Sequence, residues 1–314
     1  MDWGDRIGRR LKPRDLHIFM AVAEEGNMAK AAERLAISRP VVSKTIADLE
    51  RTLGVPLFDR SPQGIEQTLY GRALSKRSVA IFDELRQSVR EIEYLADPST
   101  GEVRIGCTET IAAGLAATAI EALSRRHPQL HFRTELGDVT TLRQYFLRER
   151  KCELIISRLL PPIEEPDLET EPLFYEKHIL VVGPGSKWLR RRKIALADLI
   201  NEPWILSPAE IVPGAPFFEA LRASRLTVPV PTILSTSLTL RSKLLPGGPF
   251  ITIAPDSVLR FGSGRLPFEP LQIKLPRTPH PVAITTLKNR TLSPTAQLFI
   301  KALREFSKPL SNRK

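Results

Sequence analysis

Three short segments in the first 67 residues carry apolar residues at intervals of three or four positions, which predicts three helices. Gly26 ends the first segment, Asn27 caps the second, and the third follows Ser38 with Pro40 in its first turn and ends at Gly54. Their apolar positions are Leu16, Phe19, Met20 and Ala23, then Ala31, Ala32 and Leu35, then Val42, Ile46, Leu49 and Leu53. The last two helices, joined by about three residues, form a helix-turn-helix, and residues 57–68 predict a small hairpin or wing.

Residues 68–96 form one uninterrupted helical pattern, free of Pro, with the only Gly in its first turn. A helix of this length is roughly 43 Å long, too long for a small winged domain to cover. Its apolar stripe consists of Leu74, Ile81, Leu85, Val89, Ile92 and Leu95. The stripe therefore pairs either with a second copy of itself or with another part of its own chain, and we favour the dimer.

Beyond residue 101 the pattern alternates between strand and helix. Strands are expected at 102–107, 130–136 and 153–157 and helices at 111–126 and 140–150, an order typical of a parallel sheet covered by helices. Pro-rich stretches at 161–166 and 266–275 enclose a second strand–helix set, and a last strand and helix follow at 282–286 and 294–306. One set is thus split around the other, which predicts two lobes that bind a ligand where the carboxyl ends of their strands face each other.

Composition and charge predict the kind of partner and the cellular compartment. The chain has 314 residues, 42% of them hydrophobic, a formal charge of +11 and two cysteines, which excludes disorder and a disulfide framework and favours a polyanionic partner. The first twelve residues resemble neither a signal peptide nor an anchor, and no segment predicts a membrane span, so we expect a cytoplasmic protein. However, residues 1–70 hold 11 basic and 10 acidic residues, whereas 287–314 hold 7 and 1. We interpret that basic tail as a solvated surface.

The first section is similar to the LysR family of transcriptional regulators. The residues that carry the resemblance are Leu16, Phe19, Ala31, Ala32, Leu35, Ser38, Pro40, Ser43, Ile46, Leu49, Glu50, Gly54, Leu57, Phe58, Arg60, Thr68 and Gly71, and a looser match continues through Gly101, Ile105, Gly106, Pro128 and 154–157. The resemblance implies a mixed fold: an all-α winged helix-turn-helix, a long linker helix that forms dimers and often tetramers, and an α/β effector domain of two lobes like a type 2 periplasmic-binding protein.

The domain boundaries follow from these patterns. We expect an extension at 1–12, a winged helix-turn-helix at 13–67, a linker helix at 68–97 and an effector-binding domain at 98–314. Within the last, lobe I comprises 101–162 and 274–306, and lobe II comprises 167–266.

The third helix is expected to enter the major groove of DNA with its first two turns. The candidate DNA-binding residues are Asn27, Lys30, Ser38, Arg39, Pro40, Ser43, Lys44 and Arg60. Arg39 stands where the family commonly has Gln; it contacts either guanine O6 and N7 or a phosphate. Lys44 contacts backbone or lies on a solvated face, and Asn27 and Lys30 are placed to bind phosphate at a helix N-terminus. Arg60 resembles the family's wing arginine.

The candidate effector site consists of residues that follow the predicted strands or begin helices. They are Thr108, Glu109, Thr110, Asp138, Ser157, Arg158, Pro213, Phe217, Thr236 and Ser237. Glu109 and Asp138 either meet an amino or hydroxyl group of the ligand or act as helix caps, and Arg158 either binds an anionic ligand or forms a salt bridge. Cys107 and Cys152 are expected roughly 15 Å apart, beyond disulfide reach.

We therefore predict a DNA-binding transcriptional regulator without catalytic residues, metal or cofactor. Its expected partners are an inverted repeat in double-stranded promoter DNA, a small-molecule inducer, further copies of itself as a dimer or tetramer, and RNA polymerase, with no membrane partner. The alternative is a cytoplasmic small-molecule-binding protein or enzyme whose N-terminal helices serve only assembly. That alternative leaves the polar residues of the third helix unexplained.

Overall fold

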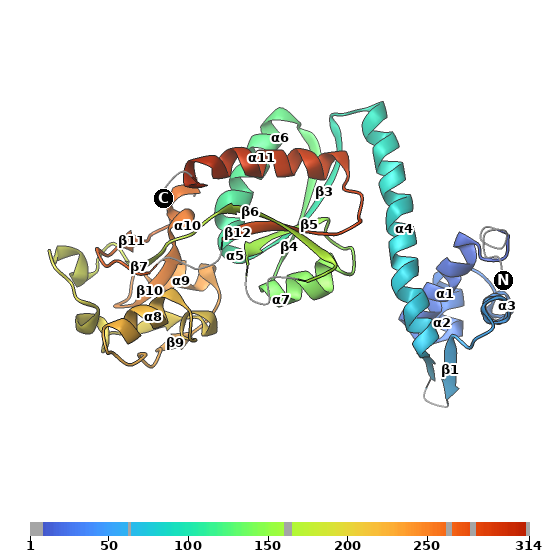
Figure 1. Cartoon of the computed structure of the whole chain (residues 1–314), viewed down its shortest axis with the longest axis horizontal. Helices are drawn as coiled ribbons and strands as arrows, with labels where there is room; N and C mark the ends of the chain where they lie inside the picture. The colour runs from blue at the N-terminus through green and yellow to red at the C-terminus, as the bar shows by residue number, and fades with distance from the viewer. Residues whose placement is uncertain (1–8, 62–63, 160–164, 262–265, 277–280, 312–314) are drawn as a thin grey trace. The chain divides into compact units, whose positions relative to one another are not determined.

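The computed structural model describes residues 9–61, 64–159, 165–261, 266–276 and 281–311 (Figure 1). It divides into two compact units, Met1–Val89 and Arg90–Lys314, which we treat separately. Among the described residues, no helix has both the length and the apolar character needed to cross a membrane.

The first unit is the predicted winged helix-turn-helix. It contains α1 (Pro13–Glu25), α2 (Met28–Arg34), α3 (Arg39–Leu53), the antiparallel hairpin of β1 (Phe58–Ser61) and β2 (Gly64–Gln67), and the start of α4 (Leu69–Ala96). Phe19 of α1 and Ile46 of α3 are fully buried, and the rings of Phe19 and Phe58 lie 5.2 Å apart, so one apolar core joins the helices to the wing. Gly26 and Gly54 end α1 and α3 in the left-handed conformation, as predicted.

The wing is held by polar contacts to its neighbours. The backbone N–H of Leu57 donates to Glu50 Oε1 of α3 (2.8 Å), and the hydroxyl of Thr68 donates to the carbonyl of Pro56 (2.7 Å). A Cβ on Gly71 would lie 2.2 Å from the Leu57 carbonyl oxygen, so only glycine permits α4 to start this close to the wing.

The predicted long helix is α4, which runs for 28 residues. Its apolar stripe is exposed: Ile81 40%, Leu85 47%, Val89 54%, Ile92 67% and Leu95 74%. No described residue covers these side chains. Single exposed apolar residues are ordinary on a protein surface, but a continuous stripe of them is not.

Lobe I of the second unit is a five-stranded sheet in the order β4-β3-β5-β12-β6. The strands are β3 (Thr100–Cys107), β4 (Gln129–Leu136), β5 (Leu154–Arg158), β6 (Leu168–Phe174) and β12 (Val282–Leu287). Its helical segments are α5 (Glu109–Ile111), η1 (Ala112–Ala116), α6 (Ala117–Arg126), α7 (Val139–Thr141), η2 (Leu142–Leu147) and α11 (Pro294–Ser311). Strand β3 is parallel to β4 and β5, but β12 runs antiparallel to β5 and β6. The sheet is therefore mixed rather than parallel, because the chain returns from lobe II into it.

Lobe II contains a second five-stranded sheet, in the order β11-β7-β10-β8-β9. Its strands are β7 (His178–Val182), β8 (Trp204–Leu206), β9 (Ile233–Leu234), β10 (Ile251–Pro255) and β11 (Glu269–Pro270). Its helical segments are η3 (Lys187–Arg190), η4 (Leu196–Leu199), η5 (Pro208–Glu210), α8 (Pro216–Ala223), α9 (Leu238–Leu244) and α10 (Asp256–Phe261). Strands β8 and β9 are parallel to β10, and β7 is antiparallel to it.

The first crossing between the lobes differs from the expectation. We expected lobe II to begin at residue 167, but β6 pairs along its length with β12 in the lobe I sheet. The chain therefore crosses at 175–177. The segment was missed because β6 is an edge strand with charged residues and an internal Pro, which a search for apolar runs does not detect.

The two cysteines lie on opposite faces of the lobe I sheet. Cys107 packs in the core with α6 and α11, and Cys152 packs in a separate cluster with η2. Both are free and buried, and burial raises the pKa of Cys107 to about 11 and that of Cys152 to about 12. The prediction that they form no disulfide is confirmed, and neither thiol is a thiolate at neutral pH.

Candidate DNA interface and effector site

The polar face of α3 is exposed at its N-terminus. Ser38, Arg39, Pro40 and Lys44 are exposed and Ser43 is half-buried, whereas Val42, Ile46 and Leu49 point into the core. Arg39 and Lys44 form no ion pair with the described residues. Ser38 occupies the N-cap position but its side chain makes no capping hydrogen bond. The amides of Val41 and Val42 already donate to the carbonyl of Ser38 (3.0 and 3.3 Å), and Pro40 has no N–H. This face therefore offers a phosphate oxygen the side chains of Arg39 and Lys44 rather than the helix amides.

The neighbouring helix is capped more conventionally. The side-chain oxygen of Asn27 accepts from the backbone N–H of Ala29 (2.7 Å) and Lys30 (3.2 Å), and the Lys30 side chain is exposed. For Arg60 only the backbone is described: it lies in β1 opposite Ile65. Asn27 therefore shapes the start of α2, and its side-chain oxygen is already occupied.

In lobe I the candidate effector residues follow three neighbouring strands. Cys107 at the end of β3 pairs with Leu136 of β4 and Ile156 of β5. Thr108 and Asp138, which follow β3 and β4, and Ser157, which is still within β5, therefore lie near the same end of these strands. The hydroxyls of Thr108 and Thr110 are 3.4 Å apart, and Ser157 is fully buried. The structure thus brings these residues together, as the strand pattern indicated.

Glu109 connects the two lobes. Its carboxylate accepts the backbone N–H of Leu238 (2.7 Å) and Thr239 (3.1 Å) at the first turn of α9, and the hydroxyl of Thr239 (3.1 Å). Ser237, next to Thr236, accepts the N–H of Leu240 (3.2 Å) from the same turn. Of the two interpretations of Glu109, the structure shows helix capping. The capped helix, α9, belongs to lobe II rather than to lobe I, which carries Glu109.

Asp138 and Arg158 also have partners within the chain. Asp138 caps α7 by accepting the N–H groups of Thr140 (2.9 Å) and Thr141 (3.0 Å), and the Thr141 hydroxyl bond is the main cause that lowers its pKa. Arg158 donates to Glu176 (2.8 Å) and lies 2.8 Å from His178 Nε2. Asp138 therefore acts as a helix cap and Arg158 forms a salt bridge within the chain.

The remaining lobe II candidates differ in placement. Phe217 is 1% exposed and packs at 4.9 Å ring separation against Trp204, so it is a core residue of lobe II rather than a ligand-facing one. Pro213 is exposed in the loop before α8. The expectation for Phe217 failed because a position in the first turn of a helix does not tell which side the ring takes.

Several polar residues were not anticipated. Buried Arg241 donates to Glu210 (2.9 Å), to the carbonyl of Ile253 (2.7 Å) and to that of Ser235 (2.9 Å), and buried Glu176 accepts from Arg158 and Ser257 at the crossing. Arg241 follows Leu238 by three residues and precedes Leu245 by four. That spacing puts it on the buried face of α9, a signal that was available in the sequence.

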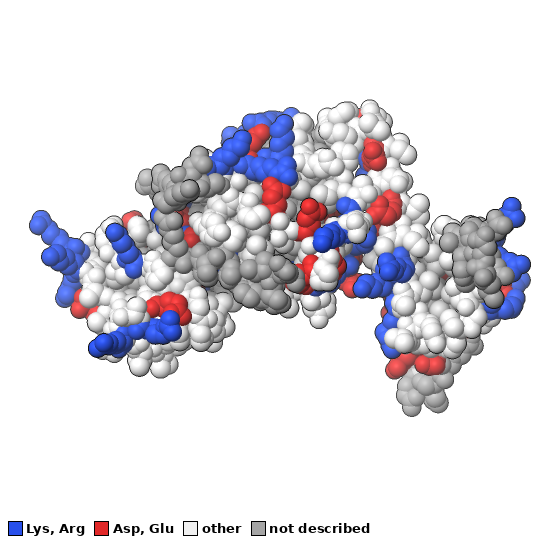
Figure 2. All heavy atoms as spheres, in the orientation of Figure 1, with Lys and Arg blue, Asp and Glu red and all other residues white. Residues whose placement is uncertain are grey.

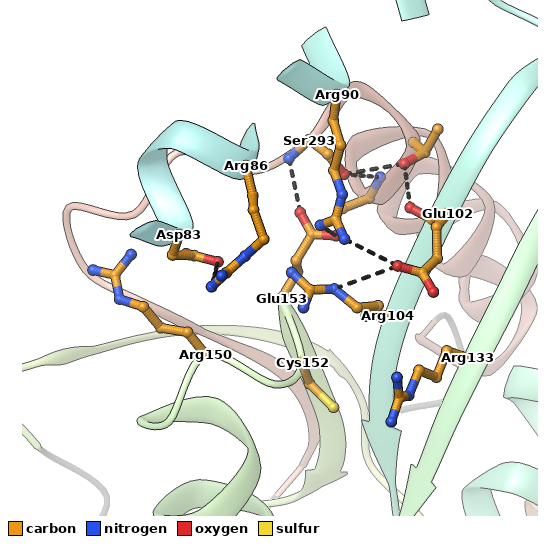
Figure 3. Close-up of polar contacts among 12 residues, drawn as sticks. Asp83, Arg86, Arg90, Glu102, Arg104, Arg133, Arg150, Cys152, Glu153 and Ser293 are labelled. Atoms are coloured by element: carbon orange, nitrogen blue, oxygen red, sulfur yellow. Dashed lines mark hydrogen bonds and ion pairs between the residues drawn. The ribbon is translucent and has the colours of Figure 1, made fainter. Parts of the chain in front are cut away.

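A further ionic cluster joins the last turns of α4 to lobe I (Figure 3). Arg90 lies 3.0 Å from Glu102 and 3.8 Å from the fully buried Glu153, which also accepts the N–H of Ser293 (2.9 Å). Arg290 donates to the carbonyl of Cys152 beside it. The cluster fixes the end of the long helix to the sheet.

An open hollow of about 820 Å³ lies beside α11, away from the candidate effector residues. Its lining includes Tyr94, Leu292, Gln297, Lys301 and Arg304. None of the ten candidate effector residues contributes to it.

Comparison with known proteins decides the family. Residues 13–72 match the family model described as bacterial regulatory helix-turn-helix protein, lysR family, and residues 96–308 match the LysR substrate binding domain. The chain belongs to the LysR family of transcriptional regulators. It is a DNA-binding regulator with an effector-binding domain. Membership in this family favours the regulator over the alternative prediction, a protein whose N-terminal helices serve only assembly.

Named relatives extend over nearly the whole chain. The HTH-type transcriptional regulator GbpR of Azospirillum brasilense is 29% identical over 303 residues, 95% of this chain and 87% of its own length. The HTH-type regulator YdcI of Escherichia coli (strain K12) is 26% identical over 308 residues, 97% and 99% of the two chains.

Solved structures share the fold of this LysR-family chain. Full-length CbnR complexed with its target DNA has a TM-score of 0.64 at 22% identity and covers 94% of this chain and 99% of its own. A second CbnR structure, described as a LysR family transcriptional regulator, has a TM-score of 0.62 at 22% identity and covers 95% and 100%. The predicted mixed architecture of a helical DNA reader and a two-lobed α/β domain is confirmed.

Proposed function

We propose that residues 13–67 read an inverted repeat in promoter DNA, with Arg39, Ser43 and Lys44 of α3 in the major groove. The observation that carries this proposal is the face of α3 described above, where Arg39 and Lys44 are exposed and form no ion pair with the described residues. A side chain engaged in an ion pair would have to break that pair before it contacted DNA. Arg39 and Lys44 have no such pair to break among the described residues. Ser38 and Pro40 begin the same surface.

The flanking contacts are assigned to the DNA backbone. Lys30 supplies charge at the start of α2, Asn27 orients the amides there, and Arg60 contacts backbone or minor groove from the wing. Such contacts set register and affinity without reading sequence.

Residues 68–97 are proposed as the dimerisation helix. The support is its apolar stripe, of which five members are at least 40% exposed. Pairing with a second copy would remove those side chains from water and place two α3 helices on the half-sites of one repeat. Dimers are proposed to assemble into tetramers that contact RNA polymerase when bound to DNA in the cytoplasm.

Residues 98–314 are proposed to bind the inducer between the lobes, with lobe I at 98–174 and 281–311 and lobe II at 178–270. Thr108, Thr110, Ser157, Thr236 and Ser237 are the proposed hydrogen-bonding groups, with Pro213 at the margin. Asp138 and Arg158 act by holding the loops, since their contacts are already made within the chain. The chain is proposed to act by binding alone, without catalysis.

Glu109 is proposed as the group that an inducer affects. Its three bonds to the start of α9 tie lobe I to lobe II, so a ligand entering there either replaces those bonds or adds to them. Either change alters the lobe angle, and in a tetramer that angle alters how dimers bend DNA.

A mobility-shift experiment on the gene's own upstream region tests the DNA-reading proposal. The full chain is expected to form a complex that survives excess nonspecific competitor at moderate salt, and failure to do so would contradict it. A thermal-shift screen of small acids, sugars and amino acids tests the second proposal. A ligand should raise the Tm of the wild type and should shift that of Ser237→Ala less.

A further inference from the structure

The most basic surface segment lies in lobe II, far in sequence from the DNA reader. Lys187, Arg190, Arg191, Arg192 and Lys193 fall within seven residues, and no Asp or Glu occurs between residues 177 and 197. All five are exposed. In Figure 2, Lys and Arg side chains project together from the end of this lobe, where Figure 1 draws the olive segment between β7 and α8.

The segment is anchored in the lobe. Trp188 of η3 is 5% exposed and packs in the lobe II core, and the charged ends of Lys187 and Arg191 lie 5.3 Å from its ring centroid. Ser186 accepts the N–H of Trp188 (3.4 Å), and Lys187 pairs with Glu202 (2.8 Å). The backbone that carries the arginines is therefore held in place before any partner arrives, which lowers the entropic cost of binding.

The arginines themselves are available. Arg190, Arg191, Arg192 and Lys193 form no ion pair with any described residue. Other arginines of the same lobe do, as in Arg222 with Glu219 (2.6 Å) and Arg260 with Asp256 (2.8 Å). Arg225 is also exposed and unpaired among the described residues, but it stands alone, whereas residues 190–193 place four unpaired cations in a row.

We propose that residues 190–193 bind phosphates of duplex DNA outside the site read by α3. Guanidinium groups match phosphate oxygens with paired hydrogen bonds, and three consecutive arginines suit a repeating phosphate backbone. Residues 1–70 carry 11 basic against 10 acidic residues and so add almost no net charge, which leaves room for a basic segment elsewhere to add to the electrostatic attraction. The inference rests on the chain binding DNA through α3, because tethering by that site raises the local concentration of the neighbouring duplex.

The test compares two duplexes and two variants of the full chain. One duplex spans only the inverted repeat read by α3, and the other extends about two helical turns, roughly 20 base pairs, beyond it on each side. The test variant is Arg190→Gln/Arg191→Gln/Arg192→Gln. The matched control is Arg126→Gln/Lys301→Gln/Lys308→Gln, which removes the same charge from exposed, unpaired positions of lobe I among the described residues. Anisotropy titrations over a salt series give the affinity and its salt dependence.

On the long duplex, the test variant should lose affinity about tenfold or more, and the slope of log Kobs against log salt should fall by about 2 to 3, at about 0.9 per lost phosphate contact. On the short duplex it should match the wild type, as should the control on both. An unchanged slope on the long duplex, or an equal loss in the control, would overturn the proposal. Reduced transcription with unchanged DNA binding would overturn it too, in favour of an acidic protein surface. Failure of the wild type on the short duplex would instead contradict DNA reading by α3.

Discussion

The two units use their polar side chains in opposite ways. In the first unit Arg39 and Lys44 are exposed and form no ion pair with the described residues. In the second unit Glu109, Asp138 and Arg158, which the sequence pattern also marked as binding residues, each bond to other parts of the chain. A surface that reads DNA keeps its charges free, whereas a domain of two lobes uses charges to hold itself together.

This contrast predicts which substitutions damage stability and which damage binding. Polar substitutions in the first unit's reading face should leave unfolding unchanged and alter DNA affinity. Substitutions of the bonded polar groups of the second unit, unlike those of the unpaired residues 190–193, should first alter the free energy of unfolding. The experiments below test that division.

The largest effect is expected at Glu153. Glu153 is fully buried, and its replacement by Ala leaves Arg90 without one carboxylate partner and Ser293 N–H without its acceptor. Breaking a buried ion pair on one side costs about 3–5 kcal/mol. Urea unfolding of the full chain, followed by tryptophan fluorescence because Trp188 and Trp204 report lobe II, measures it. Glu153→Gln keeps an acceptor for Ser293 and should recover part of the loss.

Glu121→Ala is the control for that substitution. Glu121 pairs with Arg125 at 2.5 Å, but the two side chains are 49% and 78% exposed. Such surface pairs contribute about 0–1 kcal/mol, so this variant should unfold close to the wild type. Equal losses in the two variants would contradict the division between buried and exposed charges.

The next effect is on sequence discrimination by Arg39. If Arg39 reads guanine, Arg39→Ala should lose about 1–3 kcal/mol of discrimination at one base pair and leave the others unchanged. Lys44→Ala should instead weaken all sequences alike and lower the salt slope by about 1. Titration of a site library with both variants separates them. If Arg39→Ala weakens binding to all sequences alike, Arg39 contacts a phosphate. A lowered Tm in either variant would contradict the expectation that substitutions in the reading face leave unfolding unchanged.

Much of the fold follows from local pattern, and the two units again differ. The helices, the wing and the long helix of the first unit were predicted because each shows its own periodicity and capping residues. In the second unit β6 was missed, and the helical stretches at 111–126 and 140–150 are interrupted by the π segments η1 and η2. Those details depend on packing against the sheet, which periodicity does not contain.

The same reason limits the effector site. Strand ends located Thr108, Asp138 and Ser157 correctly near the same end of three strands. However, Glu109 bonds to Leu238, 129 positions away, and no local pattern connects them. Phe217 has the sequence context of a loop residue but packs into the core against Trp204. Position along the chain was predictable, whereas the partner of each side chain required the tertiary structure.

A third effect is the acid sensitivity contributed by His178. Burial, and then the charges of Arg158 and Arg241, lower the pKa of His178 to about 3, and Arg158 donates to its Nε2, so the ring is neutral in the folded chain. In the unfolded chain the ring takes up a proton near pH 6.5. Its contribution to stability is therefore complete above that pH and is lost progressively as the pH falls toward 3.

At pH 5 the loss from this one group is about 2 kcal/mol. Urea unfolding of wild type and His178→Gln between pH 7.5 and 5 measures the difference. Glu176 contacts the same network through Arg158. If the free energies of unfolding of the two proteins depend on pH in the same way, His178 does not contribute to the acid sensitivity. That result would weaken the view that the polar groups of lobe II serve mainly to hold the lobe together.

The smallest effect is expected at Asp138. Its carboxylate is exposed and yet bonded within the chain, so a role in binding a partner and a role in stability are hardest to separate here. The hydroxyl and N–H of Thr141 lower its pKa below the usual range, so the cap is complete above pH 4 and is lost as the pH falls through the folded value. Asp138→Ala should cost about 1 kcal/mol at pH 7, and its difference from the wild type should shrink as the pH falls through the folded pKa of Asp138. Asp138→Asn retains an acceptor, so it should unfold nearly like the wild type at pH 7 while losing the pH dependence. If instead Asp138→Ala unfolds like wild type at pH 7 and weakens the Tm shift given by a ligand, then Asp138 serves the effector rather than the helix, and the second unit, like the first, keeps a charge free for its partner.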